Sequence, residues 1–239
     1  VRALLAGSPW EIICSDPGSG SSPSSASSSH PLADVGSETI EKTEASRQFR
    51  ELLVSWRRPR TDLELAEFLR SALAKADHPD EALQTLEAAA PFAQRLAADA
   101  SGEVLQLLET LVDRVAVSVH ELPLPRVVAA LRACAVAGLP HAPLFAAATA
   151  SLDSSIGADQ AVEVLEYCAA LRLAIPELRP WLQRLREQGL ERKLPASGLA
   201  RLLAASARLA LLETSEADDI LRRIATVAST MRPQSVETV

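Results

Sequence analysis

The sequence has few of the residues from which catalytic and cofactor sites are usually built. Among its 239 residues are one methionine and four histidines, and no two histidines have the i, i+4 spacing or the CxxC neighbour of a zinc site. It contains no GxxxxGK phosphate loop, and no glycine-rich fingerprint follows a strand, because strand-like runs are nearly absent. We therefore expect a non-enzyme with no cofactor, no metal and no small-molecule substrate. The histidines are His30, His78, His120 and His141, and we expect His120 and His141 in loops or caps rather than as ligands.

Cysteines and long apolar runs are equally scarce. Three cysteines are too few for a disulfide scaffold, which favours a reducing compartment. Cys134 and Cys168 occupy matching positions in two predicted helices, so we expect small buried packing residues rather than reactive thiols. No apolar run is long enough to cross a bilayer, and we expect no membrane span.

Hydrophobic residues make up 48% of the chain but aromatic residues only 3%, so Ala and Leu must fill the core. They recur every three or four residues, which predicts one-sided helices. Three stretches, Val127–Leu152, Ala161–Leu185 and Leu199–Ile224, each show a helix, a break and a second helix. Aligning Cys134 with Cys168 gives an offset of 34 residues, and Cys168 with Ser206 gives 38. Such a period is typical of stacked helical repeats.

Residues that suit helix starts occupy the breaks. Proline lacks a donor N–H and fits the first helical position. The predicted starts lie at or near Pro125, Pro140 or Pro143, Pro176 and Pro195, with Thr214 or Ser215 as the cap of the last helix. Further toward the N-terminus, Thr61 and Glu64 form a capping box, a helix starts at Asp77 or His78 and is kinked or ended by Pro91, and another starts at Ser101.

These patterns predict an all-α fold, an α-solenoid of stacked antiparallel helical hairpins. The segment 1–40 contains the Ser, Gly and Pro-rich run Ser15–Pro31 and is predicted to be a disordered or extended tether. An irregular helical region is predicted over 41–121, three hairpin repeats over 122–232, and a tail over 233–239.

Charge is unevenly distributed along the chain. The net charge is −7, yet Thr61–Glu121 has twelve acidic and four basic residues, whereas Arg172–Arg232 has eleven basic and seven acidic residues. An asymmetry of this kind points to an anionic partner at the basic end. Two interpretations remain open: a track of phosphate-binding cations aligned by the repeats, or ordinary solubilising charge. The candidates are Arg179, Arg184, Arg186, Arg192, Lys193, Arg201, Arg208, Arg222 and Arg223.

A second basic group, Arg57, Arg58 and Arg60, follows a predicted amphipathic helix over Glu41–Trp56. It is either a phosphate contact or a solvated helix end whose charges suit the helix dipole.

Glu163, Glu166 and Tyr167 share one helix but nothing converges on them, so we interpret them as a solvated face. For Trp181 the alternatives are stacking on a base and packing within a hairpin, and we favour packing.

The segments LARLLAASARLALLETSEADDILRRIA and VVAALRACAVAGLPHAPLFAAATASL resemble the roughly 34- to 38-residue repeats of organellar RNA-binding proteins. These include the octotricopeptide, heptatricopeptide and FAST-kinase-like, RAP-domain-associated groups, and the resemblance covers about Leu122 to Arg232. It implies a mitochondrial protein, or alternatively a plastid one, with organellar or ribosomal RNA and neighbouring proteins as partners. No RAP module follows Met231, which argues against a nuclease-like role.

Three repeats are also too few to read a long RNA base by base. The resemblance therefore implies a non-catalytic ribonucleoprotein component, a mitochondrial ribosome subunit or assembly factor. The alternative is a protein scaffold or accessory subunit of another organellar complex.

Overall fold

The computed structural model describes residues 46–56, 59–76, 78–96, 102–152 and 156–230. Every regular element in these ranges is a helix and none is a strand, which confirms the predicted all-α class. The predicted tether 1–40 and tail 233–239 lie outside the described residues. No helix in the described part of the chain is long and apolar enough to cross a bilayer.

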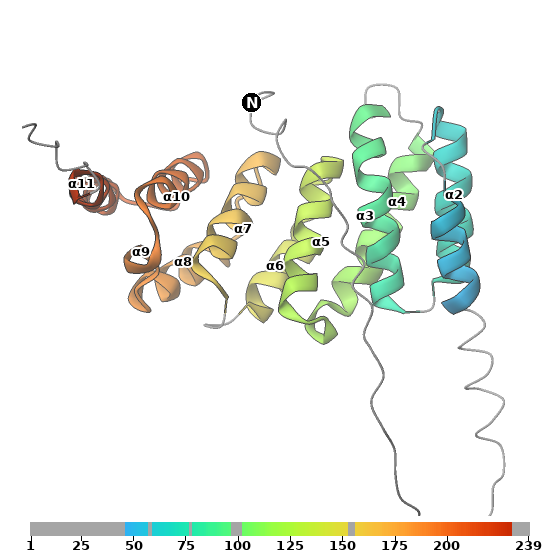
Figure 1. The fold of residues 1–239 in the computed structure, drawn as a ribbon, viewed down its shortest axis with the longest axis horizontal. Helices are drawn as coiled ribbons and strands as arrows, with labels where there is room; N and C mark the ends of the chain where they lie inside the picture. The colour runs from blue at the N-terminus through green and yellow to red at the C-terminus, as the bar shows by residue number, and fades with distance from the viewer. Residues whose placement is uncertain (1–45, 57–58, 77, 97–101, 153–155, 231–239) are drawn as a thin grey trace, which may run out of the picture.

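The helices follow one another in a single row (Figure 1). After a helix at 46–55 come α2 (Asp62–Lys75), α3 (Pro79–Leu96), α4 (Gly102–Val117), the 3₁₀ turn η1 (Val119–Glu121), α5 (Leu124–Ala137), α6 (Ala142–Ser151), α7 (Ala158–Leu171), α8 (Leu178–Glu187), α9 (Leu190–Lys193), α10 (Ala196–Arg208) and α11 (Thr214–Thr230).

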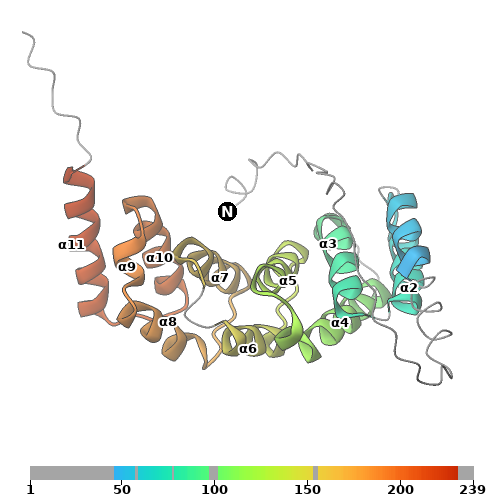
Figure 2. The same cartoon turned by 60° about the horizontal axis from the view of Figure 1, so that its bottom comes forward.

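Packing between the helices follows two parallel series. In one series α3 packs on α5, α5 on α7 and α7 on α10, and in the other α2 packs on α4, α4 on α6 and α6 on α8. Figure 2 shows the row curved like a bowl, with α3, α5, α7 and α10 on its inner side and α4, α6 and α8 on its outer side. Successive helices therefore alternate between an inner and an outer layer.

One continuous apolar core fills the space between the two layers. The stripe residues of the inner helices are buried, as Val127, Leu131, Ala161, Leu165 and Leu199 show. Burial of an aliphatic side chain of this size stabilises a fold by about 1.5 to 3 kcal/mol. Because these helices bury their apolar side chains against other helices, each is stable only together with its neighbours.

The inner helices α5, α7 and α10 end in the same turn. Gly138, Arg172 and Ala210 follow these helices and are left-handed, with φ of 72°, 55° and 52°. The next amide in each turn donates to a carbonyl inside the helix: Leu139 to Cys134 (2.9 Å), Leu173 to Cys168 (2.9 Å) and Leu211 to Ser206 (3.0 Å). The acceptors are the residues whose offsets of 34 and 38 marked the repeat in the sequence, so the backbone repeats with the same period.

Connections between the layers differ in length. Residues 152–157 join α6 to α7, whereas residues 188–195 join α8 to α10 and include the short helix α9. We call residues 188–195 the α9 connection. Its extra length is one reason why the second repeat offset exceeds the first.

Of the two alternatives predicted at Pro91, a kink or an end of the helix, the end is wrong: α3 continues to Leu96, because Ala89, Ala90 and Ala93 are buried on both sides of the proline and offset its missing hydrogen bond. The cap predicted at Thr214 or Ser215 is also wrong. Both residues lie within α11, and the Glu216 carboxylate accepts from the amide of Glu213, just before the helix, at 2.8 Å. The Thr61 cap is confirmed by a 3.3 Å hydrogen bond from the Glu64 amide.

Candidate nucleic-acid interface

The nine cations predicted in the C-terminal half lie on four consecutive helices. Three are on α8, two on α9, two on α10 and two on α11. Arg60 lies in the turn before α2, whereas Arg57 and Arg58 are outside the described residues. The structure separates the nine cations into those that carboxylates engage and those that they leave unpaired.

Three exposed arginines have an acidic partner. Arg201 of α10 makes two contacts with Glu166 of α7, from Nε to Oε1 at 2.9 Å and from Nη2 to Oε2 at 2.6 Å. Arg179 meets Glu213 at 2.7 Å, and Arg222 meets Asp219 at 3.0 Å, one turn earlier on the same helix. A phosphate that binds these arginines competes with their carboxylates for the positive charge.

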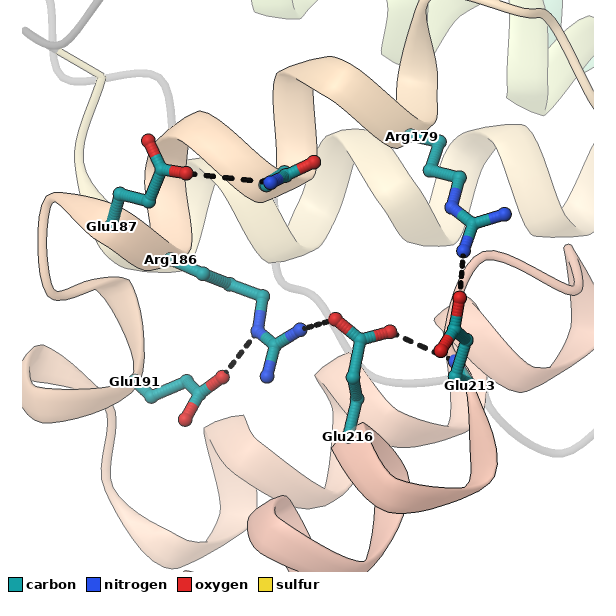
Figure 3. A network of polar contacts seen from close by, with 7 residues as sticks. Arg179, Arg186, Glu187, Glu191, Glu213 and Glu216 are labelled. Carbon is teal, nitrogen blue, oxygen red and sulfur yellow. Dashed lines mark hydrogen bonds and ion pairs between the residues drawn. The ribbon is translucent and has the colours of Figure 1, made fainter.

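Arg186 is the centre of a partly buried network (Figure 3). Its Nε lies 2.6 Å from Glu191 of α9, and its Nη1 contacts Glu216 of α11. Only 19% of the Arg186 side chain and 18% of the Glu191 side chain are exposed. Burial by itself would lower the pKa of Arg186, but the hydrogen bond and charge of Glu191, together with Glu216, raise it above the ordinary value. Arg186 therefore joins three helices and is withdrawn from solvent.

Ion pairs also connect consecutive inner helices. Arg126 of α5 contacts Asp80 at 2.7 Å and Glu87 at 3.0 Å on α3. Arg132, also on α5, donates to the Tyr167 hydroxyl at 2.9 Å and to Glu163 at 3.3 Å on α7. The prediction that nothing converges on Glu163, Glu166 and Tyr167 is therefore wrong, because arginines of both neighbouring helices, Arg132 and Arg201, pair with this face.

Other cations remain unpaired. Arg184, Arg192, Lys193 and Arg208 are exposed, and no acidic side chain in the described part of the chain pairs with them. The Arg60 side chain likewise has no acidic partner among these residues. Arg223 is half-buried, and its Nε has no hydrogen-bond partner. The charge available to a phosphate is therefore smaller than the nine residues suggested.

The cysteines, His141 and Trp181 take part in packing and helix capping. Cys134 and Cys168 are fully buried, and burial raises the pKa of each thiol to about 12. His141 caps α6 by accepting from the Leu144 amide at 3.1 Å, and Trp181 is buried with its indole N–H directed at the carbonyl of Leu152 at 3.3 Å. Within the described ranges no three His, Cys, Asp or Glu side chains gather in a way that would hold a metal.

A pocket that the sequence did not reveal lies between the helix at 46–55, α2 and the end of α3. Its volume is about 1230 Å³, and its walls include Trp56, Arg60, Phe68 and Arg95. The Trp56 ring stacks on Phe68 with centroids 3.6 Å apart. Phe68 and Arg95 lie on α2 and α3, and Trp56 and Arg60 lie between the helix at 46–55 and α2, so only a prediction of which segments meet could have assembled the pocket.

Comparison with known proteins adds no assignment. No model of a protein family matches the chain, and no curated protein matches it either.

Proposed function

We propose that this chain is a non-catalytic α-solenoid component of an organellar ribonucleoprotein, a mitochondrial ribosome subunit or assembly factor. A plastid ribonucleoprotein is the alternative location. The observation that carries the proposal is a group of exposed cations, Arg184, Arg192, Lys193 and Arg208, with which no acidic side chain of the described ranges pairs, on a protein of net charge −7. The resemblance of the repeats to organellar RNA-binding proteins supports it.

The solenoid architecture is supported by the alternation of inner and outer helices and by the recurring left-handed turn. In a solenoid, equivalent positions of successive repeats lie side by side, so a few charges in each repeat form one surface. Arginine binds phosphate through two donors at once, which suits it to RNA. The acidic half, Thr61–Glu121, would repel RNA and would face neighbouring proteins instead.

The experiment is a salt titration of RNA binding, followed by the fluorescence anisotropy of a labelled RNA hairpin. Phosphate contacts displace counterions, so each contact contributes about −0.7 to −0.9 to the slope of log affinity against log salt. Four contacts predict a slope of roughly −3. Absence of binding at low salt, or binding that salt leaves unchanged, would refute the RNA assignment.

A protein scaffold is the second candidate, and the pairing of Arg179, Arg186, Arg201 and Arg222 with carboxylates favours it. Such a scaffold would bind a peptide or helix along its inner layer. It predicts stoichiometric co-purification of a protein partner that survives both ribonuclease and high salt. A partner that is lost on ribonuclease treatment would exclude it.

A further inference from the structure

We propose that the α9 connection, residues 188–195, is the phosphate-binding element of this surface, and that the Arg186–Glu191–Glu216 network keeps Glu191 from pairing with the neighbouring cations. This inference rests on the proposed RNA function. It adds a defined contact and a reason why that contact is not neutralised.

The α9 connection is fixed at both ends. Gly189 has φ of 82°, a left-handed conformation that favours glycine, and it starts the turn. Leu190 and Leu194 are buried in the core, only 4% and 5% exposed. The Arg192 amide donates to the carbonyl of Gly189 at 2.9 Å. Arg192 and Lys193 therefore project from an ordered backbone that is anchored on either side of them.

Glu191 and Glu187, the acidic residues nearest in sequence to these cations, and Glu216 of α11 each have a side-chain partner. Glu191, the neighbour of Arg192, is held by Arg186 at 2.6 Å. Glu216 accepts from the Glu213 amide at 2.8 Å and also contacts Arg186 (Figure 3). Glu187 accepts from Gln183 at 3.4 Å. Arg186 thus holds Glu191, the one acidic residue within the α9 connection, in a contact that also includes Glu216 of α11.

Arg184, on α8, is a further exposed cation close in sequence to the α9 connection. The α9 connection begins directly after α8, and its Gln188 amide donates to the carbonyl of Arg184 at 3.1 Å. Together Arg184, Arg192 and Lys193 supply three cations with no acidic partner in the described part of the chain. Buried aromatic rings such as Trp181 are not available to stack on bases. The chemistry therefore suits the phosphate backbone of RNA, with little preference for base sequence.

The test compares the full chain with Arg192→Gln/Lys193→Gln in the anisotropy titration with a labelled RNA hairpin. Both side chains are exposed, so the variant should keep its helical circular dichroism. We expect its affinity for the hairpin to fall about three- to ten-fold. The slope of log affinity against log salt should become less negative by roughly 1.4 to 1.8, the contribution of two phosphate contacts. The matched control, Arg47→Gln/Arg70→Gln, removes two cations that pair with Glu51 and Glu103 and should bind like the parent.

The outcomes separate the two proposals. If the parent chain does not bind RNA, the proposed function fails. If the parent binds but the Arg192→Gln/Lys193→Gln variant has the same affinity and salt slope, the α9 connection is not the phosphate-binding element, while the proposal of RNA binding stands. Inorganic phosphate at the same concentration as the RNA should not displace the RNA. If it does, the α9 connection is a site for the free anion and not for the RNA backbone, and the proposal is wrong.

A second pair of variants tests the role of Arg186 as a positioning residue. Arg186→Gln releases Glu191 and Glu216, so affinity for the hairpin should fall although Arg186 does not contact RNA. Arg186→Gln/Glu191→Gln/Glu216→Gln removes the released carboxylates as well and should restore affinity. A triple variant that binds as weakly as Arg186→Gln would mean that Arg186 itself touches phosphate, and the positioning role would be wrong. Circular dichroism of both variants checks that the helices remain.

Discussion

The amide of Leu173 donates a 2.9 Å hydrogen bond to the carbonyl oxygen of Cys168, which closes α7 and places Arg172 between them in the left-handed conformation. The corresponding turn after α5 has glycine at this position, and the one after α10 has alanine. The same backbone turn is therefore made by three different residue types. Two of them have a side chain that this conformation disfavours.

Replacing these two residues by glycine should stabilise the protein. A left-handed backbone conformation costs a residue with a side chain about 1 to 2 kcal/mol, and replacement by glycine removes this cost. Glycine also increases the entropy of the unfolded chain, which offsets part of the stabilisation. We expect Arg172→Gly and Ala210→Gly each to raise the free energy of unfolding by about 0.5 to 1 kcal/mol. Gly138→Ala should lower it by a similar amount, and urea unfolding measures all three. Destabilisation by both glycine variants would refute the turn geometry.

The helices and the turns were not equally predictable from the sequence. The three-or-four spacing of Val127, Leu131 and Cys134 was enough to predict the helices, because burial of one helix face requires it. The conformation of Arg172 and Ala210 was not, since neither residue favours a left-handed turn by itself and the packing on both sides imposes it. Pro91 shows the converse, because tertiary packing overrides a strong local helix breaker.

The candidate site was predictable only in part. Arginine content and its position along the chain pointed to the C-terminal half. Pairings such as Arg201 with Glu166 depend on which helix faces meet, and sequence spacing does not specify this. The contact of Arg186 with Glu191, between α8 and α9, was likewise not predictable from sequence spacing, although Glu191 adjoins Arg192 in the chain.

Loss of Arg186 should destabilise the C-terminal end of the row. Arg186→Met leaves Glu191 and Glu216 without their cation in a partly buried site. Fully buried pairs lose about 3 to 5 kcal/mol when one partner is removed, and we expect roughly 2 kcal/mol here because a fifth to a third of these side chains is exposed. Urea unfolding measures the change. A loss below about 0.5 kcal/mol, the range of surface substitutions, would show that the network is not structural.

Acid should weaken the contact between α8 and α11. The Glu213 amide lowers the pKa of Glu216 despite opposing desolvation, and the Arg186 charge lowers it further. A carboxyl with a lower pKa in the folded state stabilises the fold above its unfolded pKa, and this contribution is lost as pH falls through the folded pKa. The free energy of unfolding should therefore decline more steeply below about pH 4.5 in the parent than in Glu216→Gln. Identical pH profiles would contradict this assignment.

Cys134 and Cys168 should be inert in the folded protein. Burial raises each pKa to about 12, so at about pH 8 only roughly one thiol in ten thousand is ionised. We expect no reaction with Ellman's reagent in a Cys14→Ser chain until denaturant is added, after which both thiols should react. The denatured sample is the control for reagent and protein concentration. Rapid labelling of the native chain would show that these helices open readily.

The central claim is that the cell uses the charged surface of this helical row to hold RNA. Its most direct test is the sedimentation of the native protein from organelle extract on a density gradient, with and without ribonuclease treatment. The account predicts that the protein sediments with a large ribonucleoprotein and moves to light fractions once the RNA is digested. Sedimentation as a free monomer before digestion, or as a large complex that ribonuclease leaves unchanged, would contradict it.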